Sequence, residues 1–271
     1  MALECVRISR LKFGMEEAPM IRLDKYLADM GVGTRSEVKR LIRQGKVTAD
    51  GAAVKSPEYR IDETSACVRV EGNEISYTKY EYYMLNKPAG VVSATEDPKE
   101  KTVLELITGR KHKGLFPVGR LDKDTEGLLL ITNDGTLAHR LLSPKKHVDK
   151  TYYARVKGLV TKETVRQFSA GMDIGKGREE RTMPAKLRII QAGEISEIRL
   201  VIQEGKYHQV KRMFQAVGME VLYLKREAFG GISLDEALPP GGARRLTKEE
   251  LGLLNGRETD GDAERHGRDY I

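Results

Sequence analysis

The sequence predicts an α+β protein that is divided into two domains. Short apolar runs separated by Gly, Pro and Asp turns alternate with a few helical patterns, and no internal repeat is visible. The chain has 271 residues, which exceeds the roughly 100–200 residues of one domain. We expect a small α+β domain over residues 21–78 and a larger domain over 79–255, whose sheet is mixed and mainly antiparallel.

Both ends of the chain differ from these two domains. Residues 1–20 show weak apolar periodicity, and Met15 and Met20 are alternative starts, so we expect a dispensable leader. A short native extension is the alternative. Residues 256–271 are polar and rich in Gly, a composition that is typical of disorder.

The small domain shows local signals for two helices and a hairpin. Apolar residues recur at helical spacing over residues 23–30. Thr34 with Glu37 three residues later is a capping box, which opens a second helix. The dipeptide Asp50-Gly51, which follows a short apolar strand, is a strong hairpin signal.

Charge is unevenly distributed along the chain. The whole sequence has 47 Lys and Arg against 40 Asp and Glu, a formal net charge of +7, and residues 20–60 alone have nine against five. A basic surface of this kind favours a polyanion as partner, and a solvated helix face is the alternative. The cations lie mainly on the second helix and directly after it: Arg35, Lys39, Arg40, Arg43 and Lys46.

This segment resembles the S-four RNA-binding module of ribosomal proteins and RNA-modifying enzymes. The resemblance rests on Ile21–Leu27, Thr34–Glu37 and Ile42–Gly51. It implies that the cations of the second helix contact RNA phosphates, which positions an RNA without reading its sequence.

Composition excludes several other classes of protein. Two cysteines, Cys5 and Cys67, are too few for a disulfide framework or a four-thiolate zinc site. No run of about 18 consecutive apolar residues is present that would form a transmembrane helix. We therefore expect a cytoplasmic protein without a membrane partner.

The larger domain begins near Tyr83, where short apolar runs and helical patterns start to alternate. We expect strands at the apolar runs 91–92, 128–131, 152–156, 198–202 and 221–224. Helical patterns lie near 102–108, 135–142, 161–171 and 207–218.

The densest cluster of ionisable residues lies within Gly119–Gly135, where Asp122, Asp124 and Glu126 crowd a short loop between two apolar runs. Three interpretations compete. A calcium loop opens in this way, but Asn133 stands where its bidentate Glu belongs, and strands flank it. A magnesium site for phosphoryl transfer or nuclease chemistry lacks a further carboxylate or His cluster. A structural acidic turn is the third interpretation.

A resemblance adds a fourth interpretation of this loop. The run Gly119–Leu129 is similar to the signature of bacterial rRNA pseudouridine synthases of the RsuA type. Other motifs follow the order and spacing of that family between residues 21 and 254. They are Tyr83–Gly90, Lys150–Tyr152, Glu204–Gly218 and the closing strand Leu224–Leu234.

The resemblance implies three active-site residues. Asp122 matches the catalytic aspartate, Tyr152 the active-site tyrosine, and Lys211 the basic residue that pairs with the aspartate; some relatives have Arg there. The reaction breaks a C–N glycosidic bond and rejoins the base through C5 without gain or loss of atoms, so we expect no cofactor and no metal. The carboxylate nucleophile must be ionised, and Lys211 is expected to supply the cation that keeps it so. Tyr152 is expected to stack on the uracil ring, to transfer a proton, or both.

The remaining candidates border this site. We expect Arg120 to fill the space of the flipped base or to grip phosphate, with a packing or surface role as the alternative. Lys206 and Arg212 are expected to contact RNA, and Asn86 and Lys87 to fix a loop that borders the pocket. Two further residues receive other roles: Asp124 is expected to shape its loop, and His208 to be structural or to contact RNA.

The resemblance also implies a substrate. The motif variants at 83–88, 93–104 and 147–152 look more like the small-subunit type, which is named for uridine 516 of 16S rRNA. The large-subunit type is one alternative, and a non-catalytic rRNA-binding assembly factor is an alternative of another class. We expect the partner to be ribosomal RNA within a small-subunit assembly particle, and the protein to be a monomer.

Overall fold

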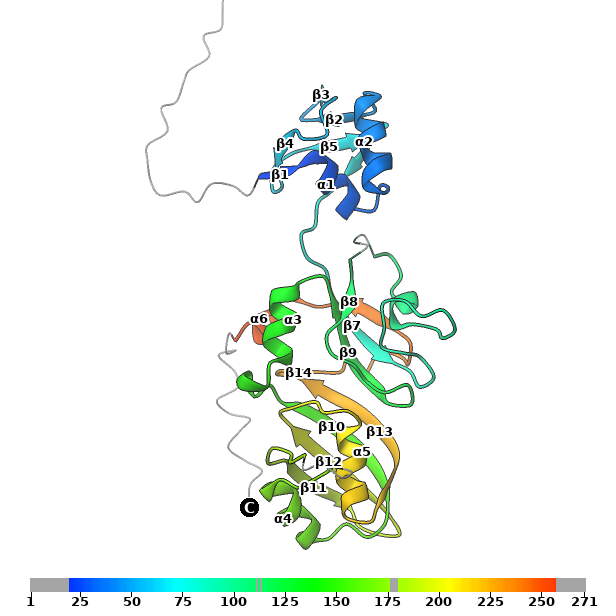
Figure 1. Cartoon of the computed structure of the whole chain (residues 1–271), viewed down its shortest axis with the longest axis vertical. Coiled ribbons are helices and arrows are strands. Elements are labelled where there is room, and N and C mark those ends of the chain that lie inside the picture. The colour runs from blue at the N-terminus through cyan, green and yellow to red at the C-terminus, as the bar shows by residue number, and fades with distance from the viewer. Residues whose placement is uncertain (1–19, 111, 113, 176–179, 257–271) are drawn as a thin grey trace, which may run out of the picture. The chain divides into compact units, whose positions relative to one another are not determined.

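The computed structural model describes residues 20–110, 112, 114–175 and 180–256. The chain divides between Lys79 and Tyr80 into two compact units, and each is described by itself (Figure 1). The expectations for residues 1–19 and 257–271 concern segments outside the described residues. Within the described ranges, no helix is long and apolar enough to cross a membrane.

The small unit combines two helices with short antiparallel strands. Its elements are β1 (Met20–Arg22), α1 (Leu23–Asp29), α2 (Arg35–Arg43), β2 (Val47–Ala49), β3 (Ala52–Ala53), β4 (Arg60–Asp62), β5 (Val68–Val70) and β6 (Asn73–Ile75). One sheet has the order β3-β2-β5-β6, and β1 pairs with β4. This arrangement is the predicted helix pair followed by a hairpin.

The local signals of the small unit act as predicted. The Thr34 backbone N–H donates to Glu37 Oε2 at 2.7 Å, and the Glu37 N–H donates to Thr34 Oγ1 at 3.3 Å, so the capping box opens α2. The hairpin between β2 and β3 turns at Asp50 and Gly51, whose φ angles are +51° and +82°. Positive φ at both positions is what a type I′ turn requires. The capping box and the hairpin turn are thus confirmed.

One apolar core holds the small unit together. Val38 and Ile42 point from α2 into this core, where they are fully buried beside Leu27 of α1. Tyr26 is buried as well, and its hydroxyl donates to the carbonyl of Ile75 at 2.6 Å, which satisfies its polar group. Since one face of α2 is committed to the core, its charged residues are left on the outer face.

The large unit is built on one sheet with helices on both sides. Its strands are β7 (Tyr82–Lys87), β8 (Phe116–Pro117), β9 (Glu126–Thr132), β10 (Lys150–Lys157), β11 (Lys186–Gln191), β12 (Ile195–Ile202), β13 (Glu220–Phe229), β14 (Ile232–Ser233) and β15 (Ala243–Arg245). Its helices are α3 (Gly135–Leu142), α4 (Lys162–Ala170), α5 (Gln209–Ala216) and α6 (Lys248–Leu254), with 3-10 turns η1 (Val103–Leu106) and η2 (Pro144–Lys146).

The sheet consists of two antiparallel halves that meet at one parallel contact. Its order is β11-β12-β10-β13-β9-β7-β15, with β14 beside β13 and β8 beside β9. Among the strands of the described residues, β13 and β9 are the one pair that runs in parallel, through Lys225 with Glu126 and Arg226 with Gly127. The predicted α+β class and the mixed, mainly antiparallel sheet are confirmed.

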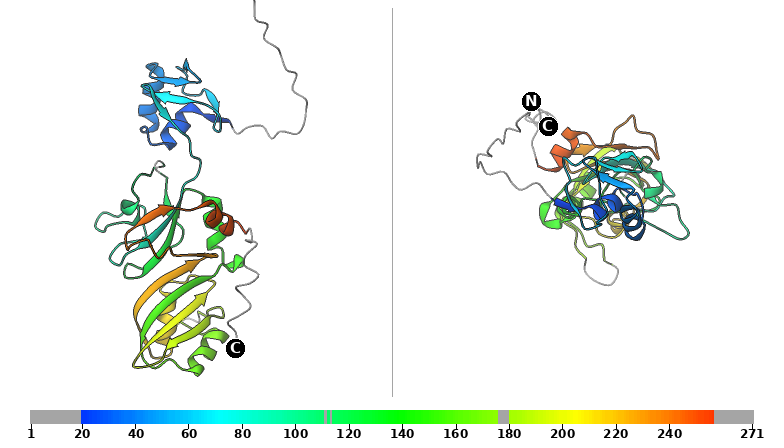
Figure 2. Two further views of the ribbon diagram at one scale, coloured as in Figure 1. Left: turned by 180° about the vertical axis from the view of Figure 1, so that it is seen from behind. Right: turned by 90° about the horizontal axis from the view of Figure 1, so that it is seen from above.

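Helices cover opposite faces of the two halves (Figure 2). Phe168 of α4 and Phe214 of α5 pack against each other, with ring centroids 4.9 Å apart, in the same core as the buried side chains of β10 and β12. On β9, alternate residues enter different cores: Leu129 faces the α5 side, whereas Leu128 packs with Leu137 of α3. This alternation explains why the run 128–131 is apolar throughout.

The junction between the halves depends on a glycine. A Cβ at Gly127 would lie 2.2 Å from the carbonyl oxygen of Arg226, so only glycine allows the two strands to approach. Next to it, the Arg226 Nε donates to the carbonyl of Leu128 at 2.8 Å, and the Tyr223 hydroxyl donates to Glu126 at 2.7 Å. These contacts fix the strand that follows the acidic loop.

Two expectations about local structure were wrong. Residues 91–92 form a single bridge, from Val92 to Thr102, rather than a strand, because Val91 is buried against the core of the large unit without a continuous partner. The pattern near 102–108 forms only the 3-10 turn η1. Four strands of the large unit were missed, namely β7, β8, β15 and β11, whose positions are mostly exposed. The helix α6, which is continuous although it contains Gly252, was missed as well.

Candidate active site

Asp122 stands on a loop between β8 and β9 that several backbone contacts hold in place. The Ser93 hydroxyl donates to the Leu121 carbonyl at 2.8 Å, and the Leu121 N–H donates to Ser93 Oγ at 3.1 Å. The Thr125 N–H closes a turn onto the Asp122 carbonyl at 3.1 Å. The loop is therefore anchored on both sides of Asp122.

A buried lysine side chain contacts the same loop from the interior of the protein. Lys87 is fully buried at the end of β7, and its Nζ lies 2.9–3.2 Å from the carbonyl oxygens of Pro88, Asp122, Lys123 and Thr125. Burial lowers the pKa of Lys87 to about 8, although the carboxylates of Asp124, Asp122 and Glu126 act in the opposite direction. Lys87 thus fixes the loop at the pocket, as predicted.

Asn86, in contrast, holds a different segment. Its side-chain amide donates to the carbonyl of Leu238 at 2.8 Å. Neither Asn86 nor Leu238 lines the pocket that contains Asp122. The expectation that Asn86 fixes the loop beside this pocket was therefore wrong, because the residue points to the other face of β7 from Lys87.

The pocket is formed by the Asp122 loop, the sheet and the start of α5. It has a volume of about 430 Å³ when the solvent in its open mouth is included. Tyr152 of β10 is 7% exposed and lies in its wall with Leu224 of β13. The pocket brings together the three residues predicted to be catalytic, Asp122, Tyr152 and Lys211.

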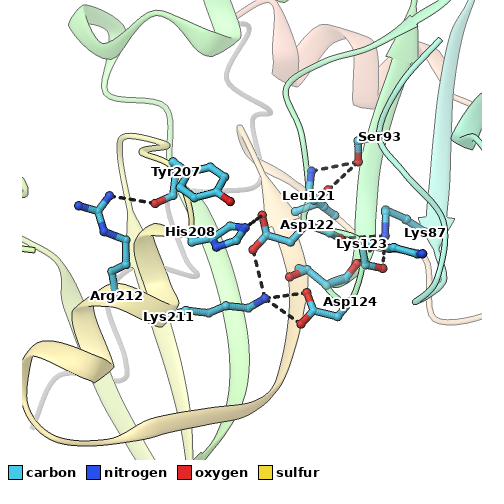
Figure 3. A network of polar contacts seen from close by, with 11 residues as sticks. Lys87, Ser93, Leu121, Asp122, Lys123, Asp124, Tyr207, His208, Lys211 and Arg212 are labelled. Atoms are coloured by element: carbon cyan, nitrogen blue, oxygen red, sulfur yellow. Dashed lines mark hydrogen bonds and ion pairs between the residues drawn. The ribbon is translucent and has the colours of Figure 1, made fainter. Parts of the chain in front are cut away.

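Two nitrogen groups from the start of α5 face the Asp122 carboxylate (Figure 3). Lys211 Nζ lies 3.3 Å from Asp122 Oδ2, and His208 Nε2 lies 3.5 Å from Oδ1. Lys211 has a closer partner in Asp124, whose two carboxylate oxygens are 2.6 and 2.8 Å from Nζ. The lysine therefore serves two carboxylates, which the sequence did not indicate.

The charges of this cluster are coupled. Burial alone would lower the pKa of Lys211, but the hydrogen bond to Asp124 and the charges of Asp122 and Asp124 outweigh it and raise that pKa. Burial works against ionisation of Asp124, yet the hydrogen bond and charge of Lys211 lower its pKa. Lys211 is therefore a permanent cation at neutral pH, next to a carboxylate that faces the pocket.

The arrangement disfavours the metal interpretations of this loop. Among the described residues, no group of three or more His, Cys, Asp or Glu side chains is placed to hold a metal ion. An ammonium group, Lys211, stands between the carboxylates of Asp122 and Asp124 where a cation would otherwise bind.

The basic residues predicted to contact RNA in the large unit differ in their placement. Arg120 is exposed at the pocket rim, and Lys206 lines the same rim with a weak ion pair to Glu204 at 3.8 Å. Arg212 donates to the carbonyls of Ile174, at 2.6 Å, and Tyr207, at 3.1 Å, and also pairs with Glu180. Its donors are used within the protein, so this placement argues against an RNA contact by Arg212.

The five basic residues of the small unit that are predicted to contact RNA lie on α2 and just beyond it. Lys39 is 3.9 Å from the buried Asp24, and Lys46 pairs with Glu71 at 2.7 Å. The other three are exposed and make no ion pair with any described residue: Arg35, Arg40 and Arg43.

Comparison with known proteins identifies the class. The family model of RNA pseudouridylate synthases matches residues 81–216, and that of the S4 domain matches residues 21–65. The uncharacterized RNA pseudouridine synthase YtzG of Bacillus subtilis is 49% identical over 236 residues, which cover 87% of this chain and 98% of YtzG. The chain therefore belongs to the RNA pseudouridylate synthase family and carries an S4 domain.

Further relatives indicate the subgroup within this family to which the chain is most similar in sequence. Ribosomal small subunit pseudouridine synthase A of Vibrio cholerae is 44% identical over 234 residues, covering 86% of this chain and 99% of the relative. The protein of that name from Escherichia coli is 41% identical over 235 residues. A crystal structure of a pseudouridylate synthase superposes with a TM-score of 0.60 at 37% identity and covers 86% of this chain and 99% of that one. The chain is thus an RNA pseudouridine synthase, and the predicted likeness to the RsuA type is confirmed.

Proposed function

We propose that this enzyme converts one uridine of 16S rRNA to pseudouridine, with Asp122 as the nucleophile. The observation that carries the proposal is the placement of the Asp122 carboxylate in the pocket wall, 3.3 Å from a lysine ammonium and beside the ring of Tyr152. A carboxylate held as an anion is a suitable nucleophile for a covalent intermediate.

The proposed chemistry balances without a cofactor. Asp122 attacks the target nucleotide, at the sugar or the base, and the bond between C1′ and N1 breaks. The uracil turns within the pocket and C5 bonds to C1′. The bond to Asp122 breaks and returns its electron pair to the carboxylate, the proton on C5 leaves, and N1 gains a proton. The product has the atoms of the substrate. Removal of the C5 proton requires a positioned base, and the freed Asp122 carboxylate or Tyr152 is within the same pocket.

Tyr152 contributes a flat surface in this scheme. Its ring is almost fully buried in the pocket wall, which suits stacking against a uracil. A proton-transfer role uses the hydroxyl instead. Tyr152→Phe keeps the ring and removes the hydroxyl, so retained activity in this variant would assign Tyr152 to stacking.

The target base must leave its helix to reach this pocket. Base flipping costs a few kcal/mol, which contacts inside the pocket and around it offset. Arg120 and Lys206 at the rim suit the phosphates beside the flipped nucleotide. We assign Arg35, Arg40 and Arg43 of the S4 domain to more distant phosphates, because they are exposed and lack ion pairs among the described residues.

The choice of 16S rRNA follows the relatives named ribosomal small subunit pseudouridine synthase A, which match nearly their whole length. We propose that the substrate is ribosomal RNA in a small-subunit assembly particle and that the enzyme acts in the cytoplasm as a monomer. The test is release of tritium from 5-tritiated uridine in 16S and 23S transcripts and in partly assembled particles. Release from small-subunit RNA alone supports the proposal. Release from 23S RNA alone would keep the reaction and overturn the substrate.

A further inference from the structure

Tyr207 is an aromatic side chain that stands in solvent beside the active site. It is 70% exposed, the highest value among the exposed large apolar side chains of the described residues. Its ring stacks on that of His208, with centroids 3.8 Å apart and planes inclined by 18° (Figure 3). Because most of the ring is accessible, this contact contributes little burial, and packing alone does not explain the residue.

The backbone at this point is held in an unusual conformation. His208 has φ +49° and ψ +34°, in the left-handed region, although it is not a glycine. Such a conformation costs roughly 5-fold to 30-fold in population, and it persists only where the surroundings hold it. His208 precedes α5 without capping it through its side chain. Its imidazole instead lies 3.5 Å from the Asp122 carboxylate.

A second set of contacts fixes the Tyr207 backbone. Arg212 Nη1 donates to the Tyr207 carbonyl at 3.1 Å, and Arg212 is itself anchored at 2.6 Å on the carbonyl of Ile174. The ring stack is thus attached to the catalytic carboxylate on one side and to a fixed arginine on the other. Arg212, which was predicted to bind RNA, therefore uses its hydrogen-bond donors inside the protein.

We propose that the Tyr207–His208 stack is a second base-binding subsite, which receives the nucleobase next to the target uridine. The proposal rests on the proposed function of the pocket. His208 lines that pocket and Tyr207 does not, so the ring of Tyr207 stands next to the pocket but outside it. Lys206 lines the rim directly beside it and suits the phosphate that joins the two nucleotides.

The chemistry of the subsite favours a nucleobase over other ligands. An exposed aromatic ring with neighbouring cations is the usual platform for unpaired nucleotides, since every base has a π-face. Flipping the target uridine breaks stacking with its neighbours, and a ring placed beside the pocket restores it for one of them. Stacking of this kind changes affinity by about 5-fold to 150-fold.

Binding is tested with an RNA fragment of 16S rRNA that the enzyme modifies, with 2-aminopurine on either side of the target. Asp122→Asn enzyme is used so that the RNA is not converted. We expect the fluorescence of one of the two positions to be quenched on binding, and the quenching to be lost in the added variant Tyr207→Ala and kept in Tyr207→Phe. Equal quenching with Tyr207→Ala would overturn the subsite.

Turnover provides the second readout, in otherwise unchanged enzyme. Tyr207→Ala should raise KM by about 5-fold to 150-fold with a smaller effect on kcat, whereas Tyr207→Phe should keep the wild-type values. Leu159→Ala, at a side chain that is 57% exposed outside the pocket, is the matched control. Unchanged KM in Tyr207→Ala would refute the subsite and leave the proposed function intact, while an inactive wild type would refute the proposed function itself.

Discussion

Replacing Lys211 by methionine should lower the kcat/KM of the enzyme at neutral pH. The methionine keeps much of the volume of the lysine but removes the charge that Asp122 and Asp124 share. At 3.3 Å, two unit charges interact by about 1 kcal/mol in water and about 5 kcal/mol at an effective dielectric constant of 20. The side chains of Lys211 and Asp122 are 27% and 28% exposed, so solvent screening favours the lower end, about 1–2 kcal/mol.

That energy predicts the size of the effect. At neutral pH, kcat/KM should fall by about 5-fold to 30-fold, because Asp122 loses the cation that holds its carboxylate in place. Lys211→Arg should retain most of the wild-type kcat/KM, and Asp124→Asn should retain most activity because Lys211 still contacts Asp122. Unchanged kcat/KM in Lys211→Met would contradict this role of Lys211.

Three further predictions concern the frame around the site. Lys87→Met should lower the free energy of unfolding by about 1–3 kcal/mol in urea titrations and reduce kcat, since four carbonyl oxygens lose their shared donor; a variant with native stability and rate would contradict this. The pKa of Lys87 falls from 10.5 to about 8 on folding, so the unfolded chain binds more protons than the folded chain between these pH values. The Lys87 contribution to the free energy of unfolding should therefore rise as the pH increases from about 8 to 10.5. The rise should be smaller in Lys87→Met than in wild type. Gly127→Ala should prevent cooperative folding in thermal unfolding, whereas Gly135→Ala, where a Cβ meets nothing within 4 Å, should not, and equal melting temperatures would rule out the proposed strand contact.

The fold is predictable from the sequence where its signals are local. The capping box at Thr34 and Glu37 and the turn at Asp50-Gly51 act over a few residues, and both are present as expected. The order of the sheet is not encoded in that way. The parallel contact of β9 with β13 joins residues about a hundred positions apart, and its signal in the sequence is one glycine, Gly127.

The residues that form the site could be predicted from the sequence, whereas several of the contacts that they make could not. Asp122, Tyr152 and Lys211 come together because three motifs in different parts of the chain converge on one pocket. Lys211 and Asp124 are 87 positions apart, so their bond depends on how α5 docks on the sheet. The left-handed backbone at His208 has no local sequence signal, since a positive φ is uncommon for any residue other than glycine.

The role of Asp122 is tested most directly by Asp122→Asn, assayed with wild type for tritium release and for binding to the same RNA. The variant keeps the shape of the side chain and removes its charge. We expect tritium release to be abolished while the Kd for the RNA is unchanged. Release at a rate close to that of wild type would contradict the assignment of Asp122 as nucleophile, and loss of binding would make Asp122 a structural residue instead.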